Sequence, residues 1–162
     1  MNVIRDIPFV LDETRLMERL HIERGSADAA AFCGMVERAV EIGCPKAGYA
    51  EVFIDEKKDD RVRLGRTCFR SRMLCMNLEP VHKLFPFVAT CGHEVDEQLP
   101  PDGDFVREFW RDTIKASLLA AATRYLRDQI HEVHRLKQSA SMSPGSGDED
   151  VWPIEQQRDL FD

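Results

Sequence analysis

The chain has 162 residues, the usual size of one domain, and its 43% hydrophobic and 31% charged residues are typical of a globular protein. Its formal charge of -7 argues against a nucleic-acid partner, because no surplus of Lys and Arg is present to neutralise a phosphate backbone. The N-terminal region lacks the pattern of a secretion signal, and no apolar run approaches the ~20 residues that span a bilayer, so we expect a cytoplasmic protein without a membrane partner.

The N-terminal half begins with a segment that alternates apolar and polar residues over 1–10, which predicts a sheet edge or an extended surface segment. Asp12 is placed to cap a short helix. A stronger helix is predicted over 26–42, because Ser26 offers a capping hydroxyl and Gly43 follows the last apolar position.

The next segment predicts a β-hairpin. Residues 49–55 alternate as in a half-buried strand, the polar run 56–60 is typical of a turn, and 61–64 return with Val62 facing inward. A basic cluster follows the acidic turn, and we interpret it as solvent-facing charge on strands, with an anion-binding edge as the alternative. Its members are Arg61, Arg63, Arg66, Arg70 and Arg72.

Residues 68–78 fit a strand or a helix equally well, because their apolar run has no clean period. Residues 87–91 predict a buried strand that ends at Gly92. One or two helical turns are expected over 93–99 before two prolines.

A long helix is predicted from a cap at Asp102 or Asp104 to about Lys137. Its length of ~50 Å exceeds the width of a domain of this size, so we expect a bend near residues 112–115. The composition then changes to a Ser, Pro and Gly loop over 139–147. Trp152-Pro153 begins a further amphipathic helix.

Cysteine usage gives no sign of a metal or redox centre. The five cysteines are irregularly spaced and form no Cys-x-x-Cys pair, so we expect buried free thiols and no metal site. They are Cys33, Cys44, Cys68, Cys75 and Cys91.

Two further pairs of side chains allow a functional and an ordinary interpretation. His131 and His134 share a helical face and form either half of a metal site or a solvated pair, since no third ligand is evident. Cys91 and His93 form a nucleophile and base or, as their spacing of two at a turn favours, an unrelated pair.

The segment Ser143-Pro144-Gly145 is the candidate ligand loop. Pro fixes one dihedral and Gly permits close backbone approach, so the main chain can present amides and carbonyls to a flat ligand. On spacing alone an ordinary Pro-Gly turn is the more common explanation of the segment.

Three blocks of sequence together resemble the activation domain of cobalamin-dependent methionine synthase and its stand-alone relatives. They are Phe87-Val88-Ala89-Thr90-Cys91-Gly92 through Glu97, the helical stretch 109–125, and Ser141 to Ser146 followed by Trp152 to Gln157 and Leu160-Phe161. The resemblance implies a single α+β domain over 1–162, with a twisted, largely antiparallel sheet and flanking helices. Because the fuller relatives continue beyond Phe161, we expect the domain to be incomplete at its C-terminus.

The resemblance also implies a function in methionine biosynthesis. The family's loop binds S-adenosylmethionine, which methylates cobalamin after reductive reactivation. The chain would then be an accessory activation subunit of a methyltransferase, with a corrinoid protein or methyltransferase core as partner and a flavodoxin-like or other electron donor. The implied cofactor-binding residues are Ser141, Ser143, Pro144, Gly145 and Ser146.

The chain departs from the family pattern at charged positions. The family's Arg in the loop is Ser141, its Tyr is Ser146, and its acidic residue falls at Ala120, while Arg124 or Arg127 are alternative partners for the ligand's carboxylate. Two hypotheses follow: an activation partner that binds S-adenosylmethionine, and a non-catalytic interaction module that docks on a corrinoid protein without it.

Overall fold

The computed structural model describes residues 1–145 and 151–161. The chain divides into two compact units. Unit 1 comprises Met1, Tyr49–Phe87 and Leu136–Asp162, and unit 2 comprises Asn2–Gly48 and Val88–Arg135. Helices and antiparallel strand pairs occur in the fold, as does a long helix in the C-terminal half, so the predicted α+β class is confirmed.

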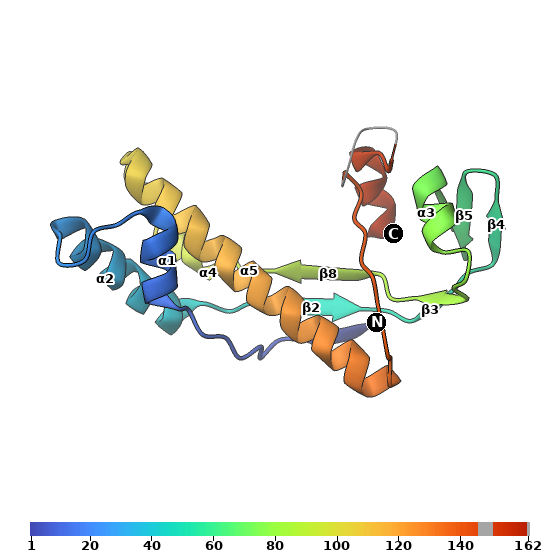
Figure 1. Cartoon of the computed structure of the whole chain (residues 1–162), viewed down its shortest axis with the longest axis horizontal. Coiled ribbons are helices and arrows are strands. Elements are labelled where there is room, and N and C mark those ends of the chain that lie inside the picture. The colour runs from blue at the N-terminus through green and yellow to red at the C-terminus, as the bar shows by residue number, and fades with distance from the viewer. Residues whose placement is uncertain (146–150, 162) are drawn as a thin grey trace. The chain divides into compact units, whose positions relative to one another are not determined.

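Unit 2 is mainly helical. Its helices are α1 (Glu13–Leu20), α2 (Ala27–Ile42), α4 (Glu94–Gln98) and α5 (Phe105–His134). Strands β1 (Asn2–Ile4), β2 (Lys46–Tyr49) and β8 (Phe87–Thr90) form a sheet in the order β1-β2-β8. The arrows of β2 and β8 run in opposite directions (Figure 1).

The predicted helix caps are confirmed. The Asp12 carboxylate accepts a hydrogen bond from the Arg15 amide at 3.0 Å, and the Ser26 hydroxyl accepts one from the Ala29 amide at 3.1 Å. Asp104, the second of the two candidate caps of the long helix, accepts from the Val106 amide at 2.9 Å. These side chains satisfy amides that have no partner within the helix.

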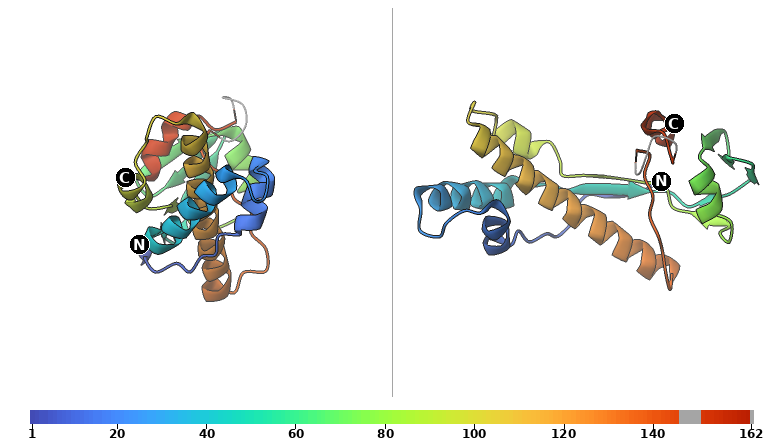
Figure 2. Two further views of the ribbon diagram at one scale, coloured as in Figure 1. Left: turned by 90° about the vertical axis from the view of Figure 1, so that its left-hand side faces the viewer. Right: turned by 45° about the horizontal axis from the view of Figure 1, so that its top comes forward.

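The core of unit 2 forms where α2 passes the first half of α5 (Figure 2). Phe32 of α2 and Trp110 of α5 meet edge to face with their ring centroids 5.7 Å apart. Ile114 and Leu118 continue the buried face of α5 at 0% exposure. Such a stripe at a spacing of three to four residues buries one side of the helix.

The bend expected in the long helix is not observed. Helix α5 runs without interruption over 30 residues, about 45 Å at 1.5 Å per residue (Figure 1). The sequence of α5 contains neither Gly nor Pro, so nothing interrupts its backbone hydrogen bonds. The expectation was wrong because it inferred a bend from domain width instead of from a helix-breaking residue.

Unit 1 contains the smaller strand pairs. Strand β3 (Val52–Phe53) pairs antiparallel with β7 (Lys83–Leu84). Strands β4 (Glu56–Lys58), β5 (Arg61–Leu64) and β6 (Thr67–Arg70) form an antiparallel sheet. Helix α3 (Arg72–Asn77) follows β6, and the 3₁₀ helix η1 (Ile154–Leu160) comes from the C-terminal segment.

The hairpin exists, but its first strand was predicted wrongly. Residues 56–58, expected in the turn, form β4 and pair with β5, so the turn is reduced to Asp59-Asp60. Asp59 adopts φ +55°, a left-handed conformation that Asp tolerates better than most residues and that tight hairpin turns require. Polarity alone therefore did not locate the turn.

Two other expectations are corrected. Strand β8 was expected to be buried, yet Phe87, Val88 and Thr90 are exposed. The cysteines are free but not buried: Cys68 is exposed and the other four are half-buried. The helix predicted after Trp152-Pro153 is present over Ile154–Leu160, as a 3₁₀ helix.

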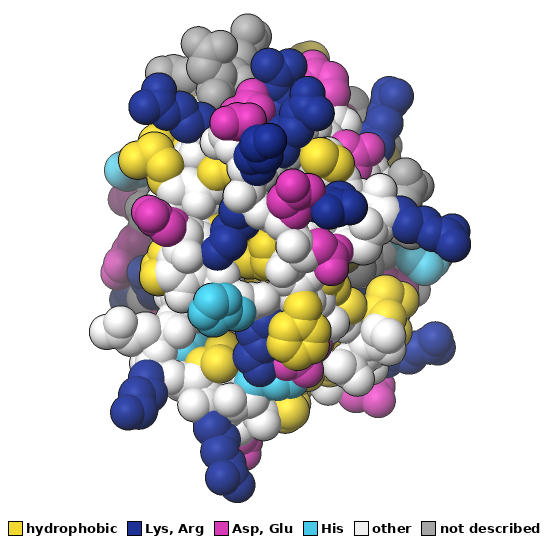
Figure 3. Space-filling model, turned by 90° about the vertical axis from the view of Figure 1, so that its right-hand side faces the viewer, with side chains coloured by type: hydrophobic (Ala, Val, Ile, Leu, Met, Phe, Trp, Pro, Cys, Tyr) yellow, Lys and Arg dark blue, Asp and Glu magenta, His cyan; other side chains and the backbone are white. Residues whose placement is uncertain are grey.

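The basic cluster lies partly on the sheet of unit 1, and its predicted alternation is confirmed for β5. Val62 is buried, whereas Arg61 and Arg63 are exposed. Asp60 accepts a hydrogen bond from the Arg70 guanidinium at 2.6 Å, which lowers the pKa of Asp60 below its usual range. Figure 3 shows basic side chains interspersed with acidic ones instead of gathered into one continuous patch.

Candidate functional site

The candidate loop is joined to the segment that begins at Val151 by a backbone hydrogen bond. The Gly145 amide donates a hydrogen bond to the Trp152 carbonyl at 2.8 Å. Gly145 adopts φ +79°, a region that L side chains rarely occupy. Ser146, the last of the candidate ligand residues, lies outside the described residues.

Trp152 anchors this segment in the core of unit 1. Its side chain is 5% exposed and packs with Val62 and Leu74. It also meets Phe69 of β6 edge to face, with centroids 5.6 Å apart and planes at 84°. A buried Trp in such a pair is among the largest single contributions to a small core.

Two polar side chains fix the backbone on either side of Trp152. Gln156 accepts a hydrogen bond from the Arg70 amide at 2.7 Å and donates one to the Arg70 carbonyl at 2.8 Å, as a neighbouring strand would. Ser71 is buried, donates to the Val151 carbonyl and accepts from the Leu74 amide at 3.0 Å, which caps α3. Neither contact is predicted from the sequence, because nothing local marks a partner about 80 positions away.

The candidate ligand residues alternate in exposure. Ser141, Ser143 and Gly145 are exposed, whereas Pro144 is buried. Met142, which lies between the two serines, is half-buried against the Trp152 cluster, and its sulfur accepts a hydrogen bond from the Asn77 amide nitrogen at 2.9 Å. Met142 and Pro144 therefore face the interior of unit 1, whereas Ser141 and Ser143 lie on the exposed side of the loop.

The space beside Gly145 is already occupied. A Cβ at this position would lie 2.5 Å from Ile154 Cδ1 and 3.3 Å from Ile154 Cβ. The glycine therefore permits a close approach of Ile154, a side chain of the same unit. A ligand on this side of the loop would have to displace Ile154, which is 53% exposed.

The alternative charged partners lie on α5 and not in the loop. Arg124 and Arg127 are exposed, and Arg127 forms an ion pair with Asp128 at 3.8 Å. Both arginines belong to unit 2, whereas the loop belongs to unit 1.

The proposed thiol and imidazole pair is not formed. The Cys91 thiol donates to the Gly92 carbonyl at 3.3 Å, whereas the His93 ring lies 3.5 Å from Glu97 and 4.0 Å from Glu94. The two side chains thus have different partners, and the geometry gives no support to a nucleophile with an adjacent base.

A partly buried ion pair lies at the same turn. Lys46 at the start of β2 donates to Glu94 at 2.8 Å, and both side chains are about one-third exposed or less. This hydrogen bond lowers the pKa of Glu94 and raises the pKa of Lys46. Gly92 makes the arrangement possible, because a Cβ there would lie 2.1 Å from the second Glu94 oxygen.

The two histidines His131 and His134 lie on the last turn of α5, as predicted. Within residues 1–145 and 151–161, no group of three or more His, Cys, Asp or Glu side chains is arranged to hold a metal ion. Of the helices in the same described ranges, none combines the length and the apolar character required to cross a membrane.

Comparison of the chain with protein-family models and with curated proteins finds no match. The likeness to the methionine synthase activation domain therefore rests on the residues of the chain itself.

Proposed function

We propose that the protein is an accessory partner in corrinoid-dependent methyl transfer in the cytoplasm. It would dock on a protein that carries cobalamin and support reductive reactivation and methylation of that cofactor, with electrons from a flavodoxin-like or other donor. The cobalamin supplies the chemistry, while the accessory protein supplies position.

The observation that carries this proposal is the packing of the described parts of the third resembling block, residues 141–145 and 151–160. Trp152 lies in the core of unit 1, and Gln156 hydrogen-bonds to the backbone of Arg70 in β6. The Trp-Pro pair and the Ser-Pro-Gly loop that carry the resemblance are thus joined by the bond between Gly145 and Trp152.

Binding of S-adenosylmethionine is the first mode in which such a partner would act. In this mode the ligand would reach the loop from solvent, where Ser143 and Gly145 are exposed, and would displace Ile154 from the space beside Gly145. Ser141 cannot replace the bidentate contact that an Arg makes with a carboxylate, a contact worth about 1.5–3 kcal/mol.

Docking without S-adenosylmethionine is the second mode, and the position of Ile154 favours it. Because Ile154 fills the space beside Gly145, the loop is closed on the side where its backbone would meet a flat ligand. In this mode the described residues 141–145 and 151–160 form part of the surface on which the corrinoid protein docks.

Calorimetric titration with S-adenosylmethionine separates the two modes. Wild type is compared with Ile154→Ala, which opens the space beside Gly145, and with Val133→Ala, which shortens a similarly exposed side chain on α5. Heat from wild type supports the first mode. Heat only from Ile154→Ala shows that Ile154 prevents S-adenosylmethionine from binding to wild type. No heat from any of the three proteins at millimolar ligand excludes the first mode and leaves docking without S-adenosylmethionine.

A further inference from the structure

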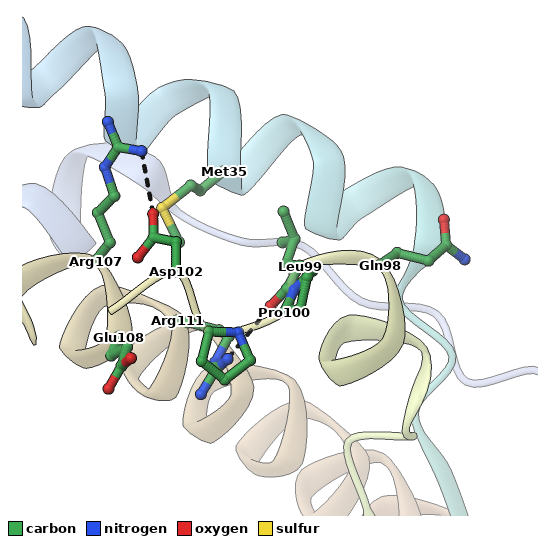
Figure 4. Close-up of a pocket in the computed structure, with 9 residues that line it drawn as sticks. Met35, Gln98, Leu99, Pro100, Asp102, Arg107, Glu108 and Arg111 are labelled. Atoms are coloured by element: carbon green, nitrogen blue, oxygen red, sulfur yellow. Dashed lines mark hydrogen bonds and ion pairs between the residues drawn. The ribbon is translucent and has the colours of Figure 1, made fainter. Parts of the chain in front are cut away.

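An arginine with little solvent exposure lines a cavity beside the first turns of α5. The cavity has a volume of about 180 Å³ and lies wholly within unit 2. The walls are formed by Met35 of α2, by the segment 98–102 that begins at the last residue of α4, and by Arg107, Glu108 and Arg111 of α5 (Figure 4).

The charge of Arg111 is poorly compensated. Its side chain is 13% exposed, and its one charged neighbour within 4.0 Å in the described chain is Asp112, which is itself 66% exposed. One terminal nitrogen donates to the Leu99 carbonyl at 3.3 Å, and the buried Nε has no hydrogen-bond partner among the described residues. A guanidinium removed from water is unfavourable unless an anion or several acceptors meet it.

The acidic side chains that line the cavity do not supply this anion. Asp102 accepts hydrogen bonds from the Asp104 amide at 3.0 Å and from Arg107 at 3.3 Å, and the amide contributes most to its lowered pKa. Figure 4 shows this Arg107 contact beside the cavity. Glu108 forms no ion pair with Arg111 in the described chain.

The remaining walls define the rest of the ligand. Met35, Leu99, Pro100 and Pro101 are apolar, and a cavity of ~150 Å³ can hold a molecule the size of benzene. Because Arg107 is paired with Asp102, Arg111 is the arginine of the wall that can meet a single negative charge, and the neighbouring Asp102 and Glu108 disfavour a dianion such as phosphate.

We propose that this cavity binds a small monocarboxylate with a short aliphatic chain, whose carboxylate accepts hydrogen bonds from the terminal nitrogens of Arg111, because the Nε is buried. The aliphatic part lies against Met35 and the two prolines. This site is independent of the proposed methyl-transfer function, because it uses neither the Ser-Pro-Gly loop nor any residue of unit 1.

The test follows backbone amide shifts of the full chain by NMR during titration with sodium butyrate. Butyramide serves as the neutral isostere, and sodium chloride controls for ionic strength. We expect saturable shifts in residues 98–111 with a Kd on the order of 1 mM, and no such shifts with butyramide. Equal binding of butyramide, or no saturable shift with butyrate, would overturn the proposal.

Three variants locate the site. Arg111→Met removes the charge, Met35→Trp fills the cavity and leaves Arg111 intact, and Arg127→Gln removes an exposed charge elsewhere on α5 as the matched control. We expect at least tenfold weaker binding in the first two variants and no change in the third. If Arg111→Met fails to fold, unchanged binding by Met35→Trp alone refutes the site.

Discussion

Replacing Gly145 with alanine tests whether Ile154 fills the space beside the candidate loop. Gly145 has φ +79°, and the added methyl group would lie 2.5 Å from Ile154 Cδ1. The left-handed backbone alone destabilises an alanine by about 1–2 kcal/mol. The crowding adds about 1 kcal/mol, because Cδ1 can rotate away while the Ile154 Cβ and Cγ1 stay close.

Gly65 provides the matched control for this substitution. It has φ +59° in the turn between β5 and β6, and a methyl group there would meet nothing within 4 Å. Gly65→Ala should therefore lose stability only through its left-handed backbone conformation and not through crowding. Urea unfolding followed by circular dichroism gives the free energy of unfolding of each variant.

The double variant Gly145→Ala with Ile154→Ala completes the cycle. We expect its loss of free energy of unfolding to be about 1 kcal/mol smaller than the sum of the losses of the two single variants, because the truncated side chain no longer meets the new methyl group. If Gly145→Ala and Gly65→Ala lose equal stability and the double variant is additive, Ile154 does not occupy this space and the case for the closed loop fails.

The other predictions concern the two cores and the ion pair. Leu118→Ala, at a position with 0% exposure, should lower the free energy of unfolding by about 2–5 kcal/mol in urea titrations; a loss below about 1 kcal/mol would contradict its place in the core. Trp152→Ala should lose about 3–5 kcal/mol and abolish the near-ultraviolet dichroism of the pair with Phe69; an unchanged spectrum would refute that pair. Because Lys46 lowers the pKa of Glu94 below its ordinary 4.5, the stabilisation by this pair is complete above pH 4.5 and is lost as the pH falls. Thermal unfolding of Glu94→Gln should therefore depend less on pH below 4.5 than wild type; parallel curves would exclude the effect.

Features fixed by local chemistry were predictable from the sequence. The caps Asp12 and Ser26 were identified because a short polar side chain before an apolar stripe satisfies free amides at close range. The alternation of buried and exposed residues around Val62 was also predictable, since successive strand residues face opposite sides of the sheet.

Features fixed by distant partners were not predictable. The observed hairpin lies later in the chain than the predicted one. Residues 52–53 of β3 pair with β7, some 30 residues later, and residues 56–58 pair with β5. The C-terminal segment depends on Gln156 and Ser71, whose contacts span more than 80 and about 80 positions.

The candidate loop combines a feature fixed by local chemistry with one fixed by a distant partner. The sequence predicts that Gly145 permits a ligand to approach the backbone closely, and that prediction stays untested. The structure shows that Ile154 approaches it instead and that Gly145 has φ +79°. What approaches it, Ile154, depends on how the chain returns, and the sequence alone does not give that path. The cavity at Arg111 was missed because its walls come from separated helices, and an arginine inside an amphipathic helix is usually solvated.

Calorimetric titration of the full chain with a cobalamin-loaded corrinoid protein of the methyltransferase class tests the proposed function most directly. We expect a saturable one-to-one complex with a Kd in the range of about 1–10 µM, and no heat with an unrelated cofactor protein of similar charge. Absence of any complex at about 100 µM of both proteins would contradict a role in corrinoid-dependent methyl transfer.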